Sequence, residues 1–332
     1  MAAIDIGTMS TKLLVTDGVS RKRRSIDTNL GGVILGANGE IRGAAISDEA
    51  LSRVEAALAS FKPLLGSNRA LTVVATAGAR RAVNNGQLVA IVERVLDAEL
   101  IIISPKTEAR LSYLGVVSDP GLARNGGTMS AEDGVLDRDG SVITFDVGGG
   151  SCEVAMGTWN DHEASYSIPI GGSVLTKAYL NGDPPLAEEL SAALSVVELH
   201  IEDVKRELPR LVPALETAII VGLGAISTIG AVEVGLGGGD DGAEADMSNG
   251  SGDGPLHGFV MSRDAAEDVF RTVATENRAD RASNPGLPLS RVDDIVGGCA
   301  ILVEILRQLD IERLVVSQRG LLDGVTSEML LA

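Results

Sequence analysis

The chain is poor in the side chains that stack on nucleic-acid bases. Its 332 residues include one tryptophan, three tyrosines and four phenylalanines, so aromatic residues make up only 2%. Single strands are bound by exposed aromatic rings and duplexes by a basic protein face, whereas this chain has a formal net charge of −18. Such a charge repels polyanions at long range unless one cleft is locally basic. We therefore expect no duplex nucleic acid among its partners.

Cysteine and long apolar runs are also scarce. The two cysteines, Cys152 and Cys299, lie far apart, which argues against a disulfide scaffold and favours a reducing compartment. No cysteine–histidine group has the spacing of a zinc site. The longest uncharged stretch, residues 217–232, is rich in glycine and shorter than the about 20 apolar residues of a membrane helix. Because the first predicted strand begins beside Met1, we expect no signal peptide, and hence a soluble cytoplasmic protein without a membrane partner.

Small aliphatic residues and glycine are abundant instead. Apolar residues make up 45% of the chain and glycine fills 40 positions, which favours an α/β architecture with tight turns. Residues 1–125 show the order βββαβαβα of a ribonuclease-H-like domain, and residues 126–319 repeat it with added helices. The helix predicted over 320–332 can join the first domain. Residues 118–140 are predicted to be a linker or exposed loop, and 237–254 a mobile surface loop.

One pattern occurs twice, at residues 4–15 and 145–156. Each copy is an apolar strand that ends in an aspartate, followed by a tight small-residue turn and a second apolar strand. A charged residue follows each aspartate seven positions later, Lys12 after Asp5 and Glu153 after Asp146. The N–H groups and hydroxyls of such turns can hold a phosphate, while the aspartates can hold a divalent cation. Two such turns facing each other would clamp a chain of phosphates.

Each of these acidic residues also has a purely structural interpretation. An aspartate at the end of a strand can cap its own turn, although turn chemistry alone does not explain two matched copies. Glu108, in the first turn of a predicted helix, can be an ordinary carboxylate favoured by the helix dipole. Glu153 can be a charge on a strand surface. If the two copies face each other, Glu108 and Glu153 both reach a water beside a phosphate, as general-base hydrolysis requires.

An ordered set of motifs resembles the exopolyphosphatase / guanosine pentaphosphate phosphohydrolase (Ppx/GppA) family in its short two-domain form. The motifs, which span nearly the whole chain, are residues 3–8 and 13–15, 75–77 with Arg80 and Asn84, 108–111 with Tyr113 and Gly115, 146–151 with Glu153, 167–171, 256–258, 285–287, Arg291 with Asp293, and Ser317 with Gly320, Leu321 and Gly324. The resemblance implies an actin-like (ASKHA) fold of two ribonuclease-H-like domains with a cleft between them.

The resemblance also implies a reaction. Water would attack the terminal phosphoryl group of inorganic polyphosphate, or of guanosine pentaphosphate, in the presence of Mg²⁺. The ligand would be polyphosphate or guanosine penta- or tetraphosphate. Glu108 would be the general base with Glu153 as its partner, while Asp5, Asp146 and Glu153 would hold Mg²⁺. The phosphate-binding residues that it implies are Gly7, Thr8, Ser10, Lys12, Arg80, Gly148, Gly149, Gly150 and Ser151.

Several positions depart from the usual family pattern. Asparagine is replaced by Met9, arginine by Lys12, aspartate by Arg81, threonine by Cys152, and two further arginines by Val174 and Leu322. Lysine lacks the bidentate fork of arginine, so we expect weak affinity for long polyphosphate and a preference for short chains. The cluster Arg21–Arg24 and the pair Arg80–Arg81 would compensate if they lined the cleft, but we predict a solvated turn at 21–24.

Two other functions stay open at this point. A catalytically weak sensor of a nucleotide or alarmone would use the same cleft, and the lost arginines favour it whereas the retained glutamates do not. An actin-like ATPase or sugar kinase would need a fuller adenosine-binding segment than Gly222–Gly224 offers. For oligomeric state, a homodimer is an open alternative to a monomer.

Overall fold

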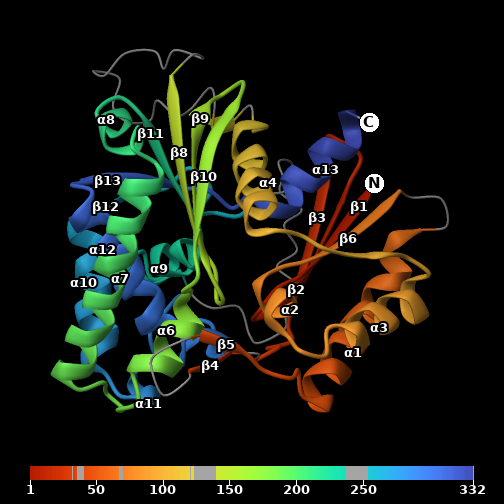
Figure 1. Cartoon of the computed structure of the whole chain (residues 1–332), viewed down its shortest axis with the longest axis horizontal. Coiled ribbons are helices and arrows are strands. Elements are labelled where there is room, and N and C mark those ends of the chain that lie inside the picture. The colour runs from red at the N-terminus through yellow and green to blue at the C-terminus, as the bar shows by residue number, and fades with distance from the viewer. Residues whose placement is uncertain are drawn as a thin grey trace.

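The computed structural model of the chain describes residues 1–31, 33–35, 41–66, 70–119, 121–122, 140–236 and 253–331. Most of the predicted linker at 118–140 lies outside this described part, as do Ala332 and all but the last two residues of the predicted loop at 237–254. Two large β-sheets, each accompanied by helices, form the body of the molecule (Figure 1).

The first sheet has five strands in the order β3-β2-β1-β6-β7. They are β1 (Ala2–Ile6), β2 (Ser10–Thr16), β3 (Arg21–Asp27), β6 (Leu71–Ala75) and β7 (Leu100–Ile102). With them come α1 (Asp48–Leu65), α2 (Ala77–Arg81), α3 (Gly86–Leu96) and a small ribbon of β4 (Val33–Leu35) and β5 (Ile41–Gly43). The β1–β2 hairpin is antiparallel, and β6 lies parallel to β1 on its other side. Ile4, Leu58 and Phe61 belong to the buried core of this half.

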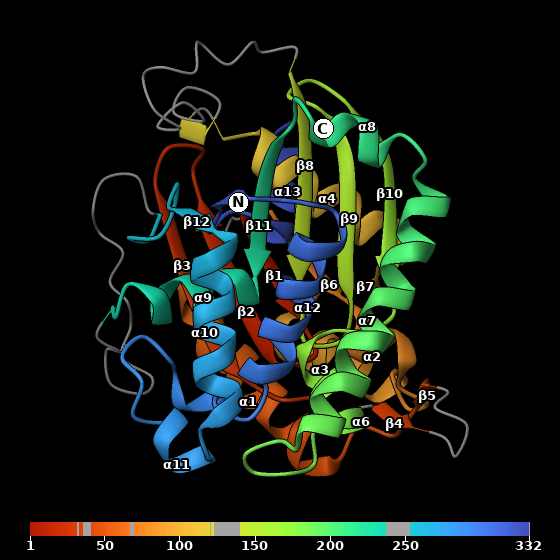
Figure 2. The ribbon, with the colours of Figure 1, turned by 90° about the vertical axis from the view of Figure 1, so that its left-hand side faces the viewer.

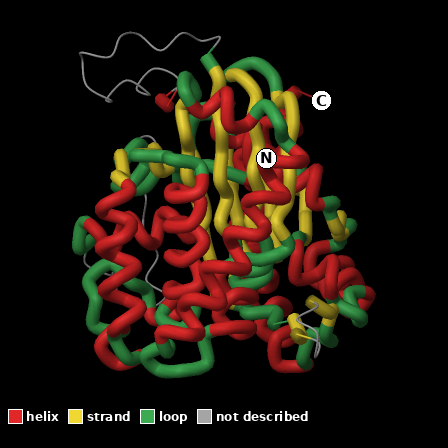
Figure 3. Tube along the Cα trace, turned by 60° about the vertical axis from the view of Figure 1, so that its left-hand side comes forward, coloured by secondary structure: helices red, strands yellow, loops and turns green. Residues whose placement is uncertain are grey.

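The second sheet has six strands in the order β10-β9-β8-β11-β13-β12. They are β8 (Ser141–Val147), β9 (Cys152–Thr158), β10 (His162–Ile168), β11 (Ile219–Gly224), β12 (Val260–Ser262) and β13 (Arg313–Val316). Its helices are α6 (Gly172–Tyr179), α7 (Ala187–Glu207), α8 (Leu211–Leu215), α9 (Ala225–Glu233), α10 (Arg263–Thr275), α11 (Arg278–Arg281) and α12 (Ile295–Gln308), with a short 3-10 turn at Leu289–Arg291. Helices α7, α10 and α12 stand together outside the strands (Figures 2 and 3). Within the described residues, no helix is both long enough and apolar enough to cross a membrane.

Two helices fill the space between the sheets. Helix α4 (Pro105–Val117) packs on β8, β9 and β10, and α13 (Leu321–Leu331) packs on β1 and β2 (Figure 1). The two helices touch each other at glycines, since a Cβ on Gly115 would lie 2.0 Å from the Gly320 oxygen and one on Gly324 would lie 1.9 Å from the Leu111 oxygen. The order sheet, α13, α4, sheet therefore brings the first turn of α4 close to both hairpins.

The predicted α/β, actin-like fold class is confirmed. Both sheets place an antiparallel hairpin next to a parallel strand from a later crossover, in the matching orders β3-β2-β1-β6 and β10-β9-β8-β11. The repeated sequence pattern forms the β1–β2 hairpin in one half and the β8–β9 hairpin in the other. The domain limits at 1–125 and 126–319, with the last helix joined to the first domain, stay a prediction.

One local prediction was wrong. Residues Arg21–Arg24 do not form a solvated turn but begin β3, the strand that pairs with β2 at the sheet edge. The turn lies just before them, because the Asp17 carboxylate accepts hydrogen bonds from the backbone N–H groups of Val19 and Ser20 at 2.9 and 2.7 Å. An aspartate that bonds the backbone two and three residues later closes the turn by itself, which leaves the arginines in the strand.

Candidate active site

A cavity of about 740 Å³ lies where the two hairpins meet. It is lined by nearly all the residues predicted for the site, namely Asp5, Gly7, Thr8, Ser10, Lys12, Glu108, Asp146, Gly148, Gly149, Gly150, Ser151 and Glu153. Arg80 is the exception, since it does not line the cavity. The structure thus brings both copies of the repeat and the start of α4 to one place.

The turn of each hairpin touches the other. We call residues 7–10 the first turn and residues 148–151 the second turn. A Cβ on Gly150 would lie 2.4 Å from the Thr8 Oγ1, and a Cβ on Gly149 would lie 2.5 Å from the Met9 Cγ. Real Cβ atoms do not approach other atoms so closely, so only glycine lets the turns meet here.

The carbonyl groups of the second turn are all held by donors. The Gly148 oxygen accepts a hydrogen bond from the Gly172 N–H, and the Gly149 oxygen accepts from the N–H groups of Ser173 and Val174, all at the start of α6. The Ser151 oxygen accepts from the Gly148 N–H within the turn. The Gly150 oxygen accepts from the Arg81 guanidinium at 2.8 Å. In a planar trans peptide the N–H points opposite to the C=O, so each held oxygen directs the following N–H the other way.

These N–H groups are therefore available to a ligand. Among the described residues, the N–H groups of Gly149, Gly150 and Ser151 have no acceptor. The first turn resembles the second. Its Thr8 oxygen accepts a hydrogen bond from the Leu30 N–H, and its Met9 oxygen accepts from the N–H groups of Thr28 and Asn29. Successive free N–H groups beside a cavity form a concave binding site for an anion such as phosphate.

The seven-residue spacing in the repeat places two charged side chains on one sheet face. Asp5 lies directly opposite Lys12 across β1 and β2, and Asp146 lies directly opposite Glu153 across β8 and β9. Directly opposed residues in an antiparallel pair project to the same side. Each hairpin consequently presents an acid and a second charge just behind its turn.

Burial makes the ionised forms of these acids costly. It raises the pKa of Asp5 to about 6, an effect that Lys12 opposes and Asp146 increases. The pKa of Asp146 is raised by burial against the 2.8 Å hydrogen bond that the Ser112 hydroxyl donates to it. The pKa of Glu153 is raised well above its ordinary value, first by burial and then by the nearby Glu108 and Asp146. The 2.8 Å hydrogen bond that the Ser167 hydroxyl donates to Glu153 opposes this shift.

Glu108 approaches the same acids from the start of α4. Ser104 caps this helix by accepting from Thr107 N–H at 3.1 Å, so Glu108 lies at the end of its first turn. Burial raises the pKa of Glu108 to about 7, while Arg80 opposes this shift and Asp5 and Asp146 add to it. The Arg80 NH1 donates to Glu108 Oε2 at 2.6 Å and also to the Ile103 oxygen at 2.9 Å, so Arg80 lies behind the glutamate as its partner.

The acid set fits a hard divalent cation. Asp5, Asp146 and Glu153 offer only oxygen donors, which Mg²⁺ and Ca²⁺ prefer. The Asp5 Oδ1 is buried and has no hydrogen-bond partner among the described residues. A buried carboxylate oxygen without a partner is costly unless a cation or a proton satisfies it. The electrostatic repulsion between these acids would be relieved by the same cation.

Sequence reasoning missed the roles of three polar residues of this site, although it considered Arg81, together with Arg80, as a cation that would line the cleft, which neither does. Ser112 and Ser167 orient the carboxylates of Asp146 and Glu153, and Arg81 holds the second turn. Ser112 could have been found, because it follows Glu108 by four positions on one helix and such residues share a helix face. The contacts of Ser167 and Arg81 depend on how the two hairpins face other elements, which no local pattern reports.

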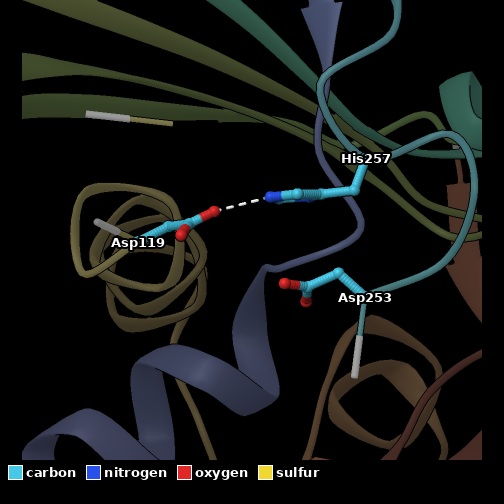
Figure 4. Close-up of side chains that lie close together, drawn as sticks. All are labelled: Asp119, Asp253 and His257. Carbon is cyan, nitrogen blue, oxygen red and sulfur yellow. Dashed lines mark hydrogen bonds and ion pairs between the residues drawn. The ribbon is translucent and has the colours of Figure 1, made fainter. Parts of the chain in front are cut away.

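A second acidic group holds Arg319, which lines the cavity. Asp119, Asp253 and His257 come within metal-ligand distance of one another, as Figure 4 shows. Arg319 already occupies this group, because its guanidinium contacts Asp119 at 2.9 Å and Asp253 at 2.5 Å. His257 accepts from Gln318 N–H at Nδ1, so its Nε2 donates to Asp119 at 2.6 Å. With both carboxylates bonded to donors, we assign this group to holding Arg319 and not to a metal.

The comparisons with known proteins agree with one another. A model of the Ppx/GppA phosphatase family matches residues 22–332. The chain is 31% identical to Exopolyphosphatase 2 of Mycobacterium tuberculosis over 98% of this chain and 97% of that protein. It is 24% identical to the guanosine-5'-triphosphate,3'-diphosphate pyrophosphatase of Photobacterium profundum over 99% of this chain and 59% of that protein. The solved Ppx/GppA family member of Aquifex aeolicus is 25% identical and superposes with a TM-score of 0.71 over 99% of this chain and 97% of that one.

Proposed function

This chain belongs to the Ppx/GppA phosphatase family and is a hydrolase, and from this premise we propose that it removes terminal phosphoryl groups from short inorganic polyphosphate with the help of Mg²⁺. The observation that carries the proposal is the pair of facing turns beside four buried carboxylates. Their free N–H groups suit a chain of phosphates, and the acids suit a cation and a general base.

In the proposed reaction, Glu108 takes a proton from the attacking water. A base with a pKa of about 7 is well matched to neutral pH, because much of it is ionised while it still accepts a proton readily. Arg80 bonds Oε2 of Glu108 and thereby leaves the other carboxylate oxygen to the water. We assign Arg80 to orienting this base, and Glu153 to supporting it from the second hairpin.

The two turns would stabilise charge on the phosphates. Phosphoryl transfer depends mostly on positioning and on electrostatic stabilisation of the equatorial oxygens. The N–H groups of Gly149, Gly150 and Ser151 do not need to reorganise, because their carbonyls are held already. Asp5, Asp146 and Glu153 would hold Mg²⁺, which when bound supplies positive charge for the phosphoryl oxygens. Lys12 and the Thr8 and Ser10 hydroxyls complete the proposed phosphate contacts.

The charges along the cavity favour a short chain. Several of its arginines already have acidic partners: Arg23 contacts Asp323 at 2.5 Å, Arg291 contacts Asp27 at 3.4 Å, and Arg319 is held as described above. An arginine that is neutralised in this way attracts a distant phosphate less strongly. A long polyanion therefore gains little from the part of the cavity beyond the two turns.

Guanosine pentaphosphate is the second candidate substrate. The cavity continues past the turns to Gly224, Ser227 and Thr228 at the start of α9, where helix N–H groups and hydroxyls face it. This end offers contacts that a simple phosphate chain does not need, and a nucleotide could use them. The similarity of this chain to the pyrophosphatase of Photobacterium profundum supports this alternative.

Phosphate release by the purified protein tests the proposal. With Mg²⁺ we expect faster release from tripolyphosphate than from long polyphosphate at equal phosphate concentration, and little from ATP. Preference for the guanosine substrate would favour the second candidate. Binding of that nucleotide without phosphate release would identify a sensor, and rapid ATP turnover would identify an ATPase. Release that is equally fast after removal of divalent cations would contradict the assigned metal dependence.

A further inference from the structure

Arg81 makes a contact that joins the two halves of the site. It is the last residue of α2, which follows the first sheet's strand β6. Its NH1 donates to the Gly150 oxygen at 2.8 Å and its NH2 donates to the Pro169 oxygen at 2.9 Å, both in the half built on the second sheet.

The backbone that carries Arg81 is firmly placed. A Cβ on Gly43 would lie 1.8 Å from the Arg81 oxygen, so β5 passes directly against the end of α2. Next to it, Ala82 N–H donates to the Gly78 oxygen at 3.1 Å and Val83 N–H donates to the Ala44 oxygen at 3.3 Å. The guanidinium thus extends from a fixed point, and its planar fork suits two carbonyl oxygens better than a single ammonium would.

Arg81 restrains the one peptide of the second turn that its own half leaves free. The oxygens of Gly148, Gly149 and Ser151 are held by α6 or within the turn, whereas the Gly150 oxygen is held only from α2 among the described residues. That oxygen shares a peptide unit with the Ser151 N–H. Without the guanidinium, rotation of this peptide would cost the turn no hydrogen bond.

We propose that Arg81 is a positioning residue of the phosphate site, which bridges the two sheets and keeps the Ser151 N–H directed at the bound anion. Arg81 itself does not line the cavity, and two of its terminal nitrogens are already bonded to carbonyls. It therefore acts through the second turn and not by contact with phosphate. The catalytic consequence rests on the proposed function, whereas the effect on the turn does not.

Three substitutions separate this role from direct phosphate binding. Lysine keeps the positive charge and one donor nitrogen, glutamine keeps one donor nitrogen without the charge, and methionine keeps neither. If Arg81 holds the carbonyls, we expect Arg81→Met to lower kcat about 10- to 100-fold. The kcat values of Arg81→Lys and Arg81→Gln should be similar to each other and lie between those of Arg81→Met and the wild type. If Arg81 binds phosphate, lysine restores activity and raises salt sensitivity, while glutamine resembles methionine. That second pattern, or a wild-type kcat in Arg81→Met, would overturn the proposal.

Hydrogen exchange without substrate tests the effect on the turn independently of activity. We expect faster exchange in Arg81→Met for the hydrogen-bonded N–H groups that depend on the second turn, namely those of Gly148, Gly172, Ser173 and Val174, with exchange of α8, at the opposite end of the second sheet, unchanged. Arg271→Met, on exposed α10, is the control for loss of one positive charge, and should leave both regions unchanged. Unchanged exchange at the second turn in Arg81→Met would overturn the inference even if the enzyme is active. An inactive wild type with the expected exchange would instead overturn only the proposed function.

Discussion

At the scale of single residues, the proposed chemistry depends on carboxylates that the fold keeps out of water. Four acids from four elements share one cavity, and burial raises the pKa of each: Asp5, Glu108, Asp146 and Glu153. Such groups are costly in the folded apo protein and become useful when a cation or a reacting proton is present. As the pH rises, the stability of the metal-free protein should consequently fall while the ionised acids that activity needs become more abundant, and Mg²⁺ should increase both stability and activity.

Asp5→Asn should stabilise the metal-free protein at alkaline pH. Because the folded pKa of about 6 exceeds the ordinary value of 3.8, Asp5 favours folding below pH 3.8, and this contribution is lost as the pH rises through 6. We expect the variant to exceed the wild type in free energy of unfolding at pH 8 by on the order of 2–3 kcal/mol, with no difference near pH 4. Denaturant unfolding at both pH values measures this. Mg²⁺ should stabilise the wild type more than the variant, and a less stable variant at pH 8 would contradict the burial argument.

Arg80→Met should move the pH dependence of the reaction. Arg80 holds the pKa of Glu108 down, so removing the guanidinium should raise that pKa above about 7. A base with a higher pKa is protonated over a wider range, and the acidic limb of the kcat/KM profile should shift to higher pH. Arg94→Met, which removes an exposed arginine paired with Glu55, provides the control. Profiles that coincide for wild type and Arg80→Met would show that Arg80 does not tune the base.

At the scale of elements, the two glycine turns and the first turn of α4 do most of the positioning. In the second turn every carbonyl is held and the N–H groups of Gly149, Gly150 and Ser151 have no acceptor among the described residues. In the first turn the Thr8 and Met9 carbonyls are held, and the two turns touch where glycine alone fits. The strands supply Asp5 and Asp146 two residues before these turns and Glu153 two residues after the second turn, at positions fixed by cross-strand register. Small changes in the turns should therefore affect catalysis far more than folding.

Gly150→Ala is the sharpest change at this scale. Its added methyl group would lie 2.4 Å from the Thr8 Oγ1 and 3.0 Å from the Ala77 Cβ, so the turns must separate. We expect phosphate release to fall at least about 10-fold, because a shift near 1 Å in a positioning group can cost two orders of magnitude. Gly86→Ala, where a Cβ meets nothing within 4 Å, is the matched control and should retain full activity. Equal rates for Gly150→Ala and wild type would mean that the close contact of the turns is not needed.

Much of this arrangement was predictable from the sequence, and the remainder has identifiable causes. The repeat located Asp5, Asp146 and both turns, because an apolar strand followed by a glycine turn is a local pattern. Helix α6 was missed, since it is short and begins at Gly172 directly after Gly171, a pair of glycines that looks like a loop. The placement of β3 was missed because a run of arginines resembles a solvated turn. Contacts such as that of Arg81 depend on the docking of two halves and leave no local signal.

At the scale of the whole molecule, the fold makes one site out of two copies of a hairpin. Helices α13 and α4 lie between the sheets, and glycines at their contact let α4 bring Glu108 to the acids of both hairpins. The copies differ where the chemistry requires it, since the first carries Lys12 and the second carries Glu153 opposite the shared aspartate. In the proposed enzyme, one hairpin holds phosphate and the other holds metal and water.

The rate of phosphate release from tripolyphosphate by Glu108→Gln, compared with the wild type in the same Mg²⁺ buffer, tests the central claim most directly. Glutamine keeps the shape of the side chain but cannot act as a base, so we predict a kcat about 10²- to 10⁴-fold lower with KM little changed. A melting temperature no lower than that of the wild type should accompany this loss and exclude misfolding as its cause. A Glu108→Gln protein that releases phosphate as fast as the wild type would contradict the claim that Glu108 activates the attacking water.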